Sequence, residues 1–131
     1  MNVILSIIVT ATTTFNLPTN LLMAVCYTES KLDPQAVHHD DGGSDSLGLC
    51  QIKLSTAQWL GFTGTREQLM NPETNAYYSA KYLKHQLLRY NNNITKAIIA
   101  YNRGSAGDLK STEYSAKVLT NLKEMTDETS N

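Results

Sequence analysis

This 131-residue chain lacks an excess of basic residues. It has 11 Lys and Arg against 12 Asp and Glu, which gives a formal net charge of −1. Binding to nucleic acid through its phosphates requires a basic stripe, so the composition argues against a nucleic-acid partner. Internal repeats and composition shifts typical of a linker are also absent. The length corresponds to one domain, residues 1–131, with a substantial core.

A long hydrophobic run is also absent. The apolar stretch over residues 3–9 is far too short to span a bilayer, so we expect no stable membrane insertion. No Lys or Arg precedes it and no convincing small-residue cleavage site follows it, which argues against a signal peptide. We expect the stretch to form the first helix of the fold, because apolar residues recur there at helical spacing: Ile4, Ile7, Ile8, Ala11 and Phe15.

The remaining elements are predicted to be mainly α-helical. Pro18 stands at a first-turn position of a second helix that runs to Ser30. Residues 31–47 are rich in Gly, Asp and Ser and hold at most a small hairpin around 41–43. A long helix begins at Asn71-Pro72, where Asn71 and Asn75 are expected to cap and brace it. Further helices are predicted over residues 56–60, 94–101 and 114–125, followed by a frayed tail over 126–131.

Glu29 stands on the apolar face of the second helix, at helical spacing from Leu22, Val25 and Cys26. A carboxylate on such a face is costly to ionise and takes up a proton unless it finds a partner. A carboxyl group that stays protonated near neutral pH is what a general acid requires. The alternative is a Glu at a helix end that faces solvent or pairs with Lys31.

Four segments follow Glu29-Ser30 in order along the chain: Leu32-Asp33-Pro34, Gly48-Leu49-Cys50-Gln51-Ile52, Asn71-Pro72-Glu73-Thr74-Asn75 and Ala100-Tyr101-Asn102-Arg103-Gly104. Together with Glu29-Ser30 they resemble the catalytic domain of the soluble lytic transglycosylases, in the lysozyme-like superfamily, over about residues 17–120. The resemblance implies a mainly α, α+β lysozyme-like fold, in which a helical bundle surrounds a substrate cleft. It implies no cofactor.

The resemblance also implies a reaction on the glycan strands of peptidoglycan. Glu29 would protonate the glycosidic oxygen between N-acetylmuramic acid and N-acetylglucosamine, then take the proton from the C6 hydroxyl. That hydroxyl closes on C1 and leaves a 1,6-anhydro end. One carboxylate is enough because the substrate's acetamido group can steady the cationic centre, an exception to the two-carboxylate rule.

Further substrate-binding residues follow from the resemblance. Gln51 would offer its amide to sugar or acetamido groups, although it would equally serve to tie its loop to a neighbouring helix. Gly48 would let backbone approach the substrate closely, and Ser46 lies beside it. Cys50 replaces the usual Met of this motif.

The later motifs supply Tyr101, Asn102 and Tyr114 as further substrate-binding candidates. The hydroxyl of Tyr101 would reach the acid or the acetamido group. Tyr114 would be a second tyrosine of the groove, or alternatively a core residue of the last helix. Arg103 departs from the family pattern, which has a small residue there.

Several alternatives remain open. Asp40, Asp41 and Asp45 follow Glu29 closely and would serve a muramidase that hydrolyses the same bond with a second carboxylate, although Asp and Gly also favour plain turns. A competitor of another class is a non-catalytic module for cell-wall binding or virion structure. Cys26 and Cys50 would pair in a disulfide or stay as buried thiols.

His38-His39 lacks a third ligand at a recognisable spacing, so no metal site is predicted. With no export signal expected in the chain, the sequence indicates a monomeric enzyme of the periplasm or cell wall. It would belong to a bacteriophage virion, be released at lysis as an endolysin, or serve a secretion machine.

Overall fold

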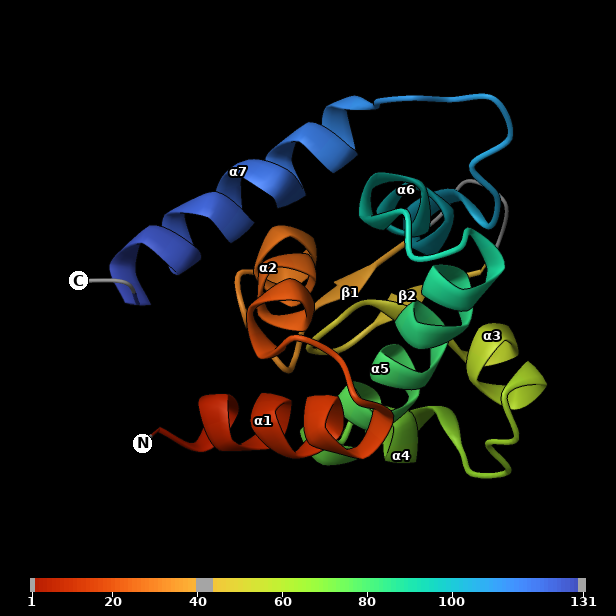
Figure 1. Ribbon diagram of the computed structural model, residues 1–131. Helices are drawn as coiled ribbons and strands as arrows, with labels where there is room; N and C mark the ends of the chain where they lie inside the picture. The colour runs from red at the N-terminus through yellow and green to blue at the C-terminus, as the bar shows by residue number, and fades with distance from the viewer. Residues whose placement is uncertain (1, 40–43, 130–131) are drawn as a thin grey trace.

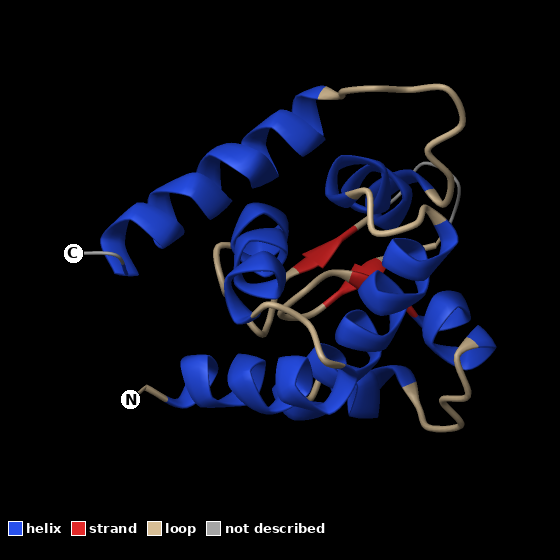
Figure 2. Ribbon diagram, viewed as in Figure 1, coloured by secondary structure: helices blue, strands red, loops and turns tan. Residues whose placement is uncertain are grey.

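The structure is a computed structural model that describes residues 2–39 and 44–129. It is mainly helical, as predicted, with a small sheet lying among the helices (Figure 2). The elements follow along the chain in this order: α1 (Val3–Phe15), α2 (Thr19–Ser30), β1 (Val37–His38), β2 (Ser46–Leu47), β3 (Ile52–Lys53), α3 (Leu54–Trp59), α4 (Arg66–Leu69), α5 (Pro72–Arg89), α6 (Ile94–Arg103) and α7 (Glu113–Thr129).

The sheet has three antiparallel strands in the order β1-β2-β3. Its register places Val37 opposite Leu47, and Leu47 in turn opposite Ile52. The expected hairpin corresponds to β1 and β2, although its predicted turn at 41–43 lies outside the described residues. The third strand was not predicted, because a strand of two residues carries no periodic signal.

Helix α1 confirms that the apolar N-terminal stretch belongs to the fold. The side chain of Asn2 caps its start, and Ile7, Ile8 and Ala11 are buried against the rest of the core. Helix α1 packs on α5 and α2. Within the described ranges, no helix combines the length and the apolar character needed to cross a membrane.

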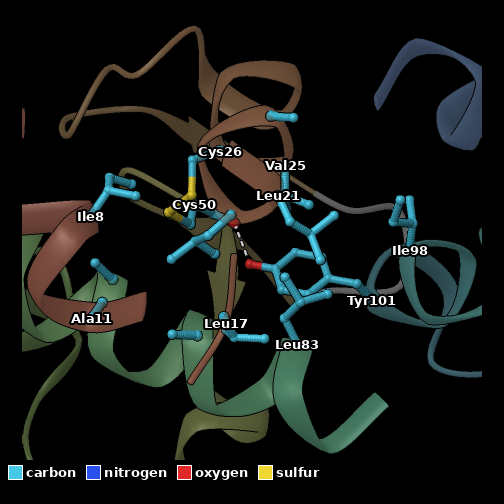
Figure 3. Close-up of a cluster of buried hydrophobic side chains, with 14 of the residues drawn as sticks. Ile8, Ala11, Leu17, Leu21, Val25, Cys26, Cys50, Leu83, Ile98 and Tyr101 are labelled. Carbon is cyan, nitrogen blue, oxygen red and sulfur yellow. Dashed lines mark hydrogen bonds between the residues drawn. A yellow bond between two sulfur atoms is a disulfide. The ribbon is translucent and has the colours of Figure 1, made fainter. Parts of the chain in front are cut away.

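Helix α2 lies between α1 and α7 in Figure 1, at the centre of the molecule. Pro18 is the residue that precedes its first turn, one position earlier than predicted. Leu21, Val25 and Cys26 are buried in the cluster that Figure 3 shows, which also receives side chains from α1, α5 and α6. The helix that carries the candidate acid is therefore fixed by the core along most of its length.

The later helices differ from the predictions mainly at their ends. Helix α3 begins at Leu54, two residues before the predicted start, and α4 was missed because its four residues are too few for a helical pattern. A capping box between Thr65 and Gln68 stabilises α4. Asn71 caps α5 as predicted. Helix α7 continues to Thr129, past residue 126, where a frayed tail was expected to begin.

Candidate active site

Glu29 lies in the last turn of α2, where the helix meets the loop over residues 48–51. The helix ends at Ser30 because Lys31 adopts the left-handed conformation, with φ 57°. The Ser30 hydroxyl donates to the carbonyl of Leu49 at 2.6 Å. The end of the helix is therefore tied to the loop, and the position of Glu29 is set by the same contact.

The surroundings of Glu29 favour its protonated form. Burial raises the pKa of its carboxyl group from 4.5 to about 7, since the charged form loses hydration. Two smaller effects oppose this rise: the Tyr114 hydroxyl donates a hydrogen bond of 2.8 Å to Glu29 Oε2, and the charge of His38 is attractive. Near neutral pH the group is close to half protonated, so it has a proton to give and can also take one back.

The loop over residues 48–51 is held by a buried side chain of α5. Asn75 Oδ1 accepts from the backbone N–H of Cys50 at 2.9 Å, and Asn75 Nδ2 donates to the carbonyls of Leu47 and Leu69. Gly48 has φ +77°, and a Cβ at this position would lie 2.5 Å from Asn75 Nδ2. Glycine is therefore required here because the backbone of residue 48 approaches the Asn75 side chain closely. Asn75 was expected to brace its own helix, but it braces this loop instead.

Gln51 lines the cleft, yet its amide is occupied within the protein. Its Nε2 donates to the carbonyls of Ala36 at 3.0 Å and Gly48 at 2.9 Å. Its Oε1 is 2.5 Å from His38 Nδ1, which must be the donor because an amide oxygen only accepts. These contacts favour the alternative in which Gln51 ties its loop in place, and they leave only acceptor capacity on Oε1 for a substrate.

Cys26 and Cys50 form a disulfide, with 4.2 Å between their Cα atoms. The sequence left this pairing open, and the structure decides it. Cys26 stands on α2 one turn before Glu29, and Cys50 immediately precedes Gln51 in the loop. The bond therefore joins the helix of the acid to the loop beside it, as the yellow bond in Figure 3 shows.

The two candidate tyrosines make different contacts near the acid. The hydroxyl of Tyr101 donates to the carbonyl of Cys50 at 2.7 Å, the dashed contact in Figure 3, and does not bond to the acid. Burial and the nearby Glu29 raise the pKa of Tyr101, so it stays protonated. Tyr114 is the tyrosine that donates to Glu29, and burial raises its pKa in the same way.

Glu29 lies between two hollows that together form the cleft. The first has a volume of about 240 Å³ and brings together five of the predicted residues with others: Glu29, Ser46, Gln51, Ile52, Lys53, Thr56, Tyr82, Tyr101, Asn102, Arg103 and Gly104. The second, of about 520 Å³, is lined by Tyr114, Thr28, Thr112, Glu113 and Lys117 and shares Glu29, Asn102 and Arg103 with the first. Gly48 is buried against Asn75 and lines neither hollow.

A third hollow extends the first one on the side away from Tyr114. It has a volume of about 470 Å³ and shares Thr56, Tyr82 and Gly104 with the first. Trp59, which is 64% exposed, contacts His85 there edge to face, with 4.8 Å between the ring centres, and Arg89 lies in the same wall. Because they share lining residues, the three hollows adjoin one another and are together called the groove, and Glu29 lines two of them.

The loop aspartates do not supply a second carboxylate to this groove within the described residues. Asp45 is held by Arg66 at 2.8 Å and by His39 at 2.9 Å, and these two partners lower the pKa of its carboxyl group. Asp40 and Asp41 lie outside the described residues. In the first hollow Glu29 is the sole carboxylate among the lining residues, and Glu113 in the second is exposed and 3.8 Å from Lys117.

The sequence reading missed several residues that shape the site. Tyr82, Thr56 and Lys53 line the first hollow, and Asn75 and His38 hold its loop. Of these residues, Asn75 could most easily have been found from the sequence. A polar residue followed by Ala76 and Ala80 on a helix indicates a buried hydrogen-bonding role. Within the described part of the chain, no group of three metal-binding side chains forms a cluster.

The chain is similar to known proteins in both sequence and fold. The family model described as the transglycosylase SLT domain matches residues 6–126. Protein IpgF of Shigella flexneri is 30% identical over 94 residues, which are 70% of this chain and 61% of IpgF. Invasion protein IagB of Salmonella typhi is 32% identical over 125 residues, which are 89% of this chain and 77% of IagB.

A solved structure shares the fold at lower sequence identity. It is an inactive Glu-to-Gln mutant of the lytic transglycosylase Slt of Pseudomonas aeruginosa, and it matches 90% of this chain with a TM-score of 0.68 and 22% identity. This chain covers 21% of Slt and 61% of IpgF, so it corresponds to part of each of these longer proteins.

Proposed function

Because the chain belongs to the transglycosylase SLT domain family, we propose that it is a lytic transglycosylase acting on peptidoglycan. It cleaves the β-1,4 bond between N-acetylmuramic acid and N-acetylglucosamine and leaves a 1,6-anhydromuramic end. The observation that carries the proposal is the state of Glu29. This residue lines the groove, and burial raises the pKa of its carboxyl group to about 7.

The reaction needs one group that gives a proton and then recovers one. The carboxyl group of Glu29 donates its proton to the glycosidic oxygen as the bond to C1 breaks, and the N-acetylglucosamine side leaves as an alcohol. The acetamido oxygen of the muramic acid steadies the positive charge at C1. The carboxylate of Glu29 then takes the proton of the C6 hydroxyl, and O6 bonds to C1. No water is consumed, and Glu29 ends in its starting form.

Tyr114 supports both halves of this cycle. Its hydroxyl donates to Glu29 Oε2 and so leaves Oε1 as the oxygen that exchanges the proton with substrate. When Glu29 is ionised, the same hydrogen bond stabilises the carboxylate and moderates the pKa that burial has raised. Tyr114 is thus a positioning residue for the acid.

The groove favours transglycosylation over hydrolysis. An inverting hydrolase places a second carboxylate roughly 6.5–9.5 Å from the first to activate water. Among the described residues of the first hollow, Glu29 is the only acid, and the carboxylate of Asp45 is engaged by Arg66 and His39. Among the described residues, no second carboxylate is placed to activate a water molecule, and this supports the substrate's own C6 hydroxyl as the nucleophile.

The disulfide supports an extracytoplasmic place of action. Disulfides form and persist in oxidising compartments such as the bacterial periplasm, and Cys26–Cys50 is buried beside the acid. We infer that the protein works in the periplasm or cell wall. Its use in a virion, at lysis or in a secretion machine stays a prediction, as does its monomeric state.

Mass spectrometry of digested peptidoglycan tests the proposal. We expect anhydro ends from the wild-type protein, whereas reducing ends would indicate a muramidase and intact strands a non-catalytic module. Glu29→Gln should lower the rate by about 10²–10⁴-fold, the usual worth of general acid catalysis. The matched control is Glu124→Gln, which changes an exposed carboxylate of α7 that lines none of the three hollows and should retain activity. A folded Glu29→Gln protein with normal turnover would contradict the mechanism.

A further inference from the structure

Arg103 occupies a position in the groove that the proposed reaction does not use. It is the last residue of α6, it is exposed, and it lines both hollows that meet at Glu29. The transglycosylase pattern that the chain resembles has a small residue here, so Arg103 departs from that pattern. Tyr114 and His38 are the groups that lower the pKa of Glu29, and Arg103 is not among them. The pKa of the acid therefore stays raised although Arg103 lines the same hollows.

Arg89 brings a second guanidinium group to the third hollow, next to the two that Arg103 lines. Its Nη1 donates to the carbonyl of Gly104, the residue after Arg103, at 2.9 Å, and to Gln86 Oε1 at 3.3 Å. Both acceptors are neutral, and one nitrogen makes both bonds. The guanidinium also lies over the Tyr90 ring, with 4.9 Å from its carbon to the ring centre. Its other N–H groups make no hydrogen bond to a described residue and can serve another acceptor. Arg89 also lines the third hollow beside His85.

Neither guanidinium is neutralised by a carboxylate of the described residues. Across residues 2–39 and 44–129, no carboxylate forms an ion pair with Arg103 or Arg89. The chain as a whole carries a net charge of −1, so this concentration of positive charge is local and not a consequence of composition. Guanidinium groups bind carboxylates in a bidentate geometry that ammonium groups do not match.

The sugar rings of the proposed substrate are uncharged, but the muramic acid is not. Its C3 lactyl group carries a carboxyl that is either free or joined to a stem peptide with carboxylates of its own. We propose that Arg103, with Arg89, binds a carboxylate borne on the lactyl arm of the muramic acid, so that the protein prefers anionic glycan strands to neutral ones. This inference rests on the proposed function and adds to it the charge selectivity of the same groove.

Cleavage rates on four substrates test the inference. Two are anionic: peptidoglycan with intact stem peptides, and strands stripped by an amidase, which leaves free lactyl carboxylates. The other two are the same materials after their carboxylates are coupled to a neutral amine. At low substrate concentration, we expect wild type to be about three- to tenfold slower on a neutralised substrate than on its anionic parent. This corresponds to an exposed, partly screened ion pair.

Variants separate recognition of charge from a structural role. Arg103→Gln should be slow on anionic substrate and lose the difference between parent and neutralised material, whereas Arg103→Lys should keep part of it. A cation in the last turn also stabilises a helix. If this were the only role of Arg103, its replacement would lower the stability of the protein and leave substrate preference unchanged. Lys123→Gln is the control for charge, because Lys123 is exposed on α7 and lines none of the three hollows. It should behave as wild type.

The substrate arms also identify the carboxylate. An Arg103-dependent difference confined to peptide-bearing strands assigns the stem peptide, and one that persists on stripped strands assigns the lactyl group. If wild type forms anhydro ends at equal rates on parent and neutralised substrates, the inference is overturned while the proposed function stands. Should no cleavage occur, sedimentation of Glu29→Gln protein with sacculi decides the inference. Equal binding to native and neutralised sacculi would overturn it.

Discussion

Replacing Tyr114 by Phe removes the one hydrogen bond that a side chain gives to the acid in the described structure. The bond is 2.8 Å long and stabilises the carboxylate form of Glu29, so its loss should raise a pKa that already stands at about 7. A hydrogen bond to a charged group contributes about 1.5–3 kcal/mol, and the lower value applies here because Tyr114 is only half-buried. Since 1.36 kcal/mol corresponds to one pKa unit, the pKa of Glu29 should rise by about one unit.

The pH dependence of kcat/KM reports this change. The free enzyme must hold its proton on Glu29, so activity falls on the alkaline side as pH passes the pKa of that group. We expect this alkaline limb to lie near pH 7 in wild type and about one unit higher in Tyr114→Phe. The assay is the initial rate of anhydro-muropeptide release, measured from pH 5 to 10 at low substrate concentration.

Tyr101→Phe is the matched control, because the hydroxyl of Tyr101 donates to the Cys50 carbonyl and not to Glu29. It should lower stability, since a buried carbonyl loses its partner, and leave the alkaline limb in place. The charge of His38 also lowers the pKa of Glu29, but this effect is common to all three proteins. An alkaline limb that stays in place in Tyr114→Phe, or moves to lower pH, would refute the reasoning.

Three further predictions concern stability. Gly48→Ala should lower the free energy of unfolding by about 1–3 kcal/mol in urea titrations, because the residue has φ +77° and its Cβ would lie 2.5 Å from Asn75 Nδ2; an unchanged midpoint would contradict the role of Asn75. Reduction of Cys26–Cys50 should cost about 3 kcal/mol for a loop of this length, visible as a lower melting temperature in dithiothreitol that Cys26→Ala no longer shows. The raised pKa of Glu29 stabilises the folded state most below pH 4.5, and this contribution is lost as pH rises through about 7. Glu29→Gln should therefore be more stable than wild type by about 3 kcal/mol at pH 8 and lose most of this advantage at pH 4, as denaturant titrations at both values will show.

The sequence was sufficient to predict the helix that carries Glu29 from local spacing, and the resemblance of the motifs that follow singled out Glu29 as the candidate acid. An apolar stripe at intervals of three and four residues identifies the buried face of a helix wherever it occurs. The same reasoning identified the N-terminal helix and the Asn71 cap. These features depend only on residues that are close in the sequence, so they can be predicted before the fold is known.

The sequence could not show in this way which tyrosine contacts the acid. Tyr114 is 85 residues from Glu29, and Tyr101 is 51 residues from Cys50. Helical spacing places both tyrosines on inward faces, but the tilt of α6 and α7 against α2 decides where their hydroxyls lie. For the same reason the sequence left the role of Gln51 open and placed Gly48 against substrate, since each residue is held by a contact across the fold, with Ala36 or Asn75.

The contacts that hold Cys50 share a property that bears on the acid. Cys50 is anchored to three helices at once: to α2 by the disulfide, to α5 through its N–H and Asn75, and to α6 through its carbonyl and Tyr101. None of these anchors carries a charge. A Lys or Arg brace at this distance from Glu29 would attract the carboxylate and return its pKa toward the ordinary value. Neutral bracing therefore lets the loop be rigid while the acid keeps its proton, and Cys50 in place of the usual Met supplies the strongest of the three anchors.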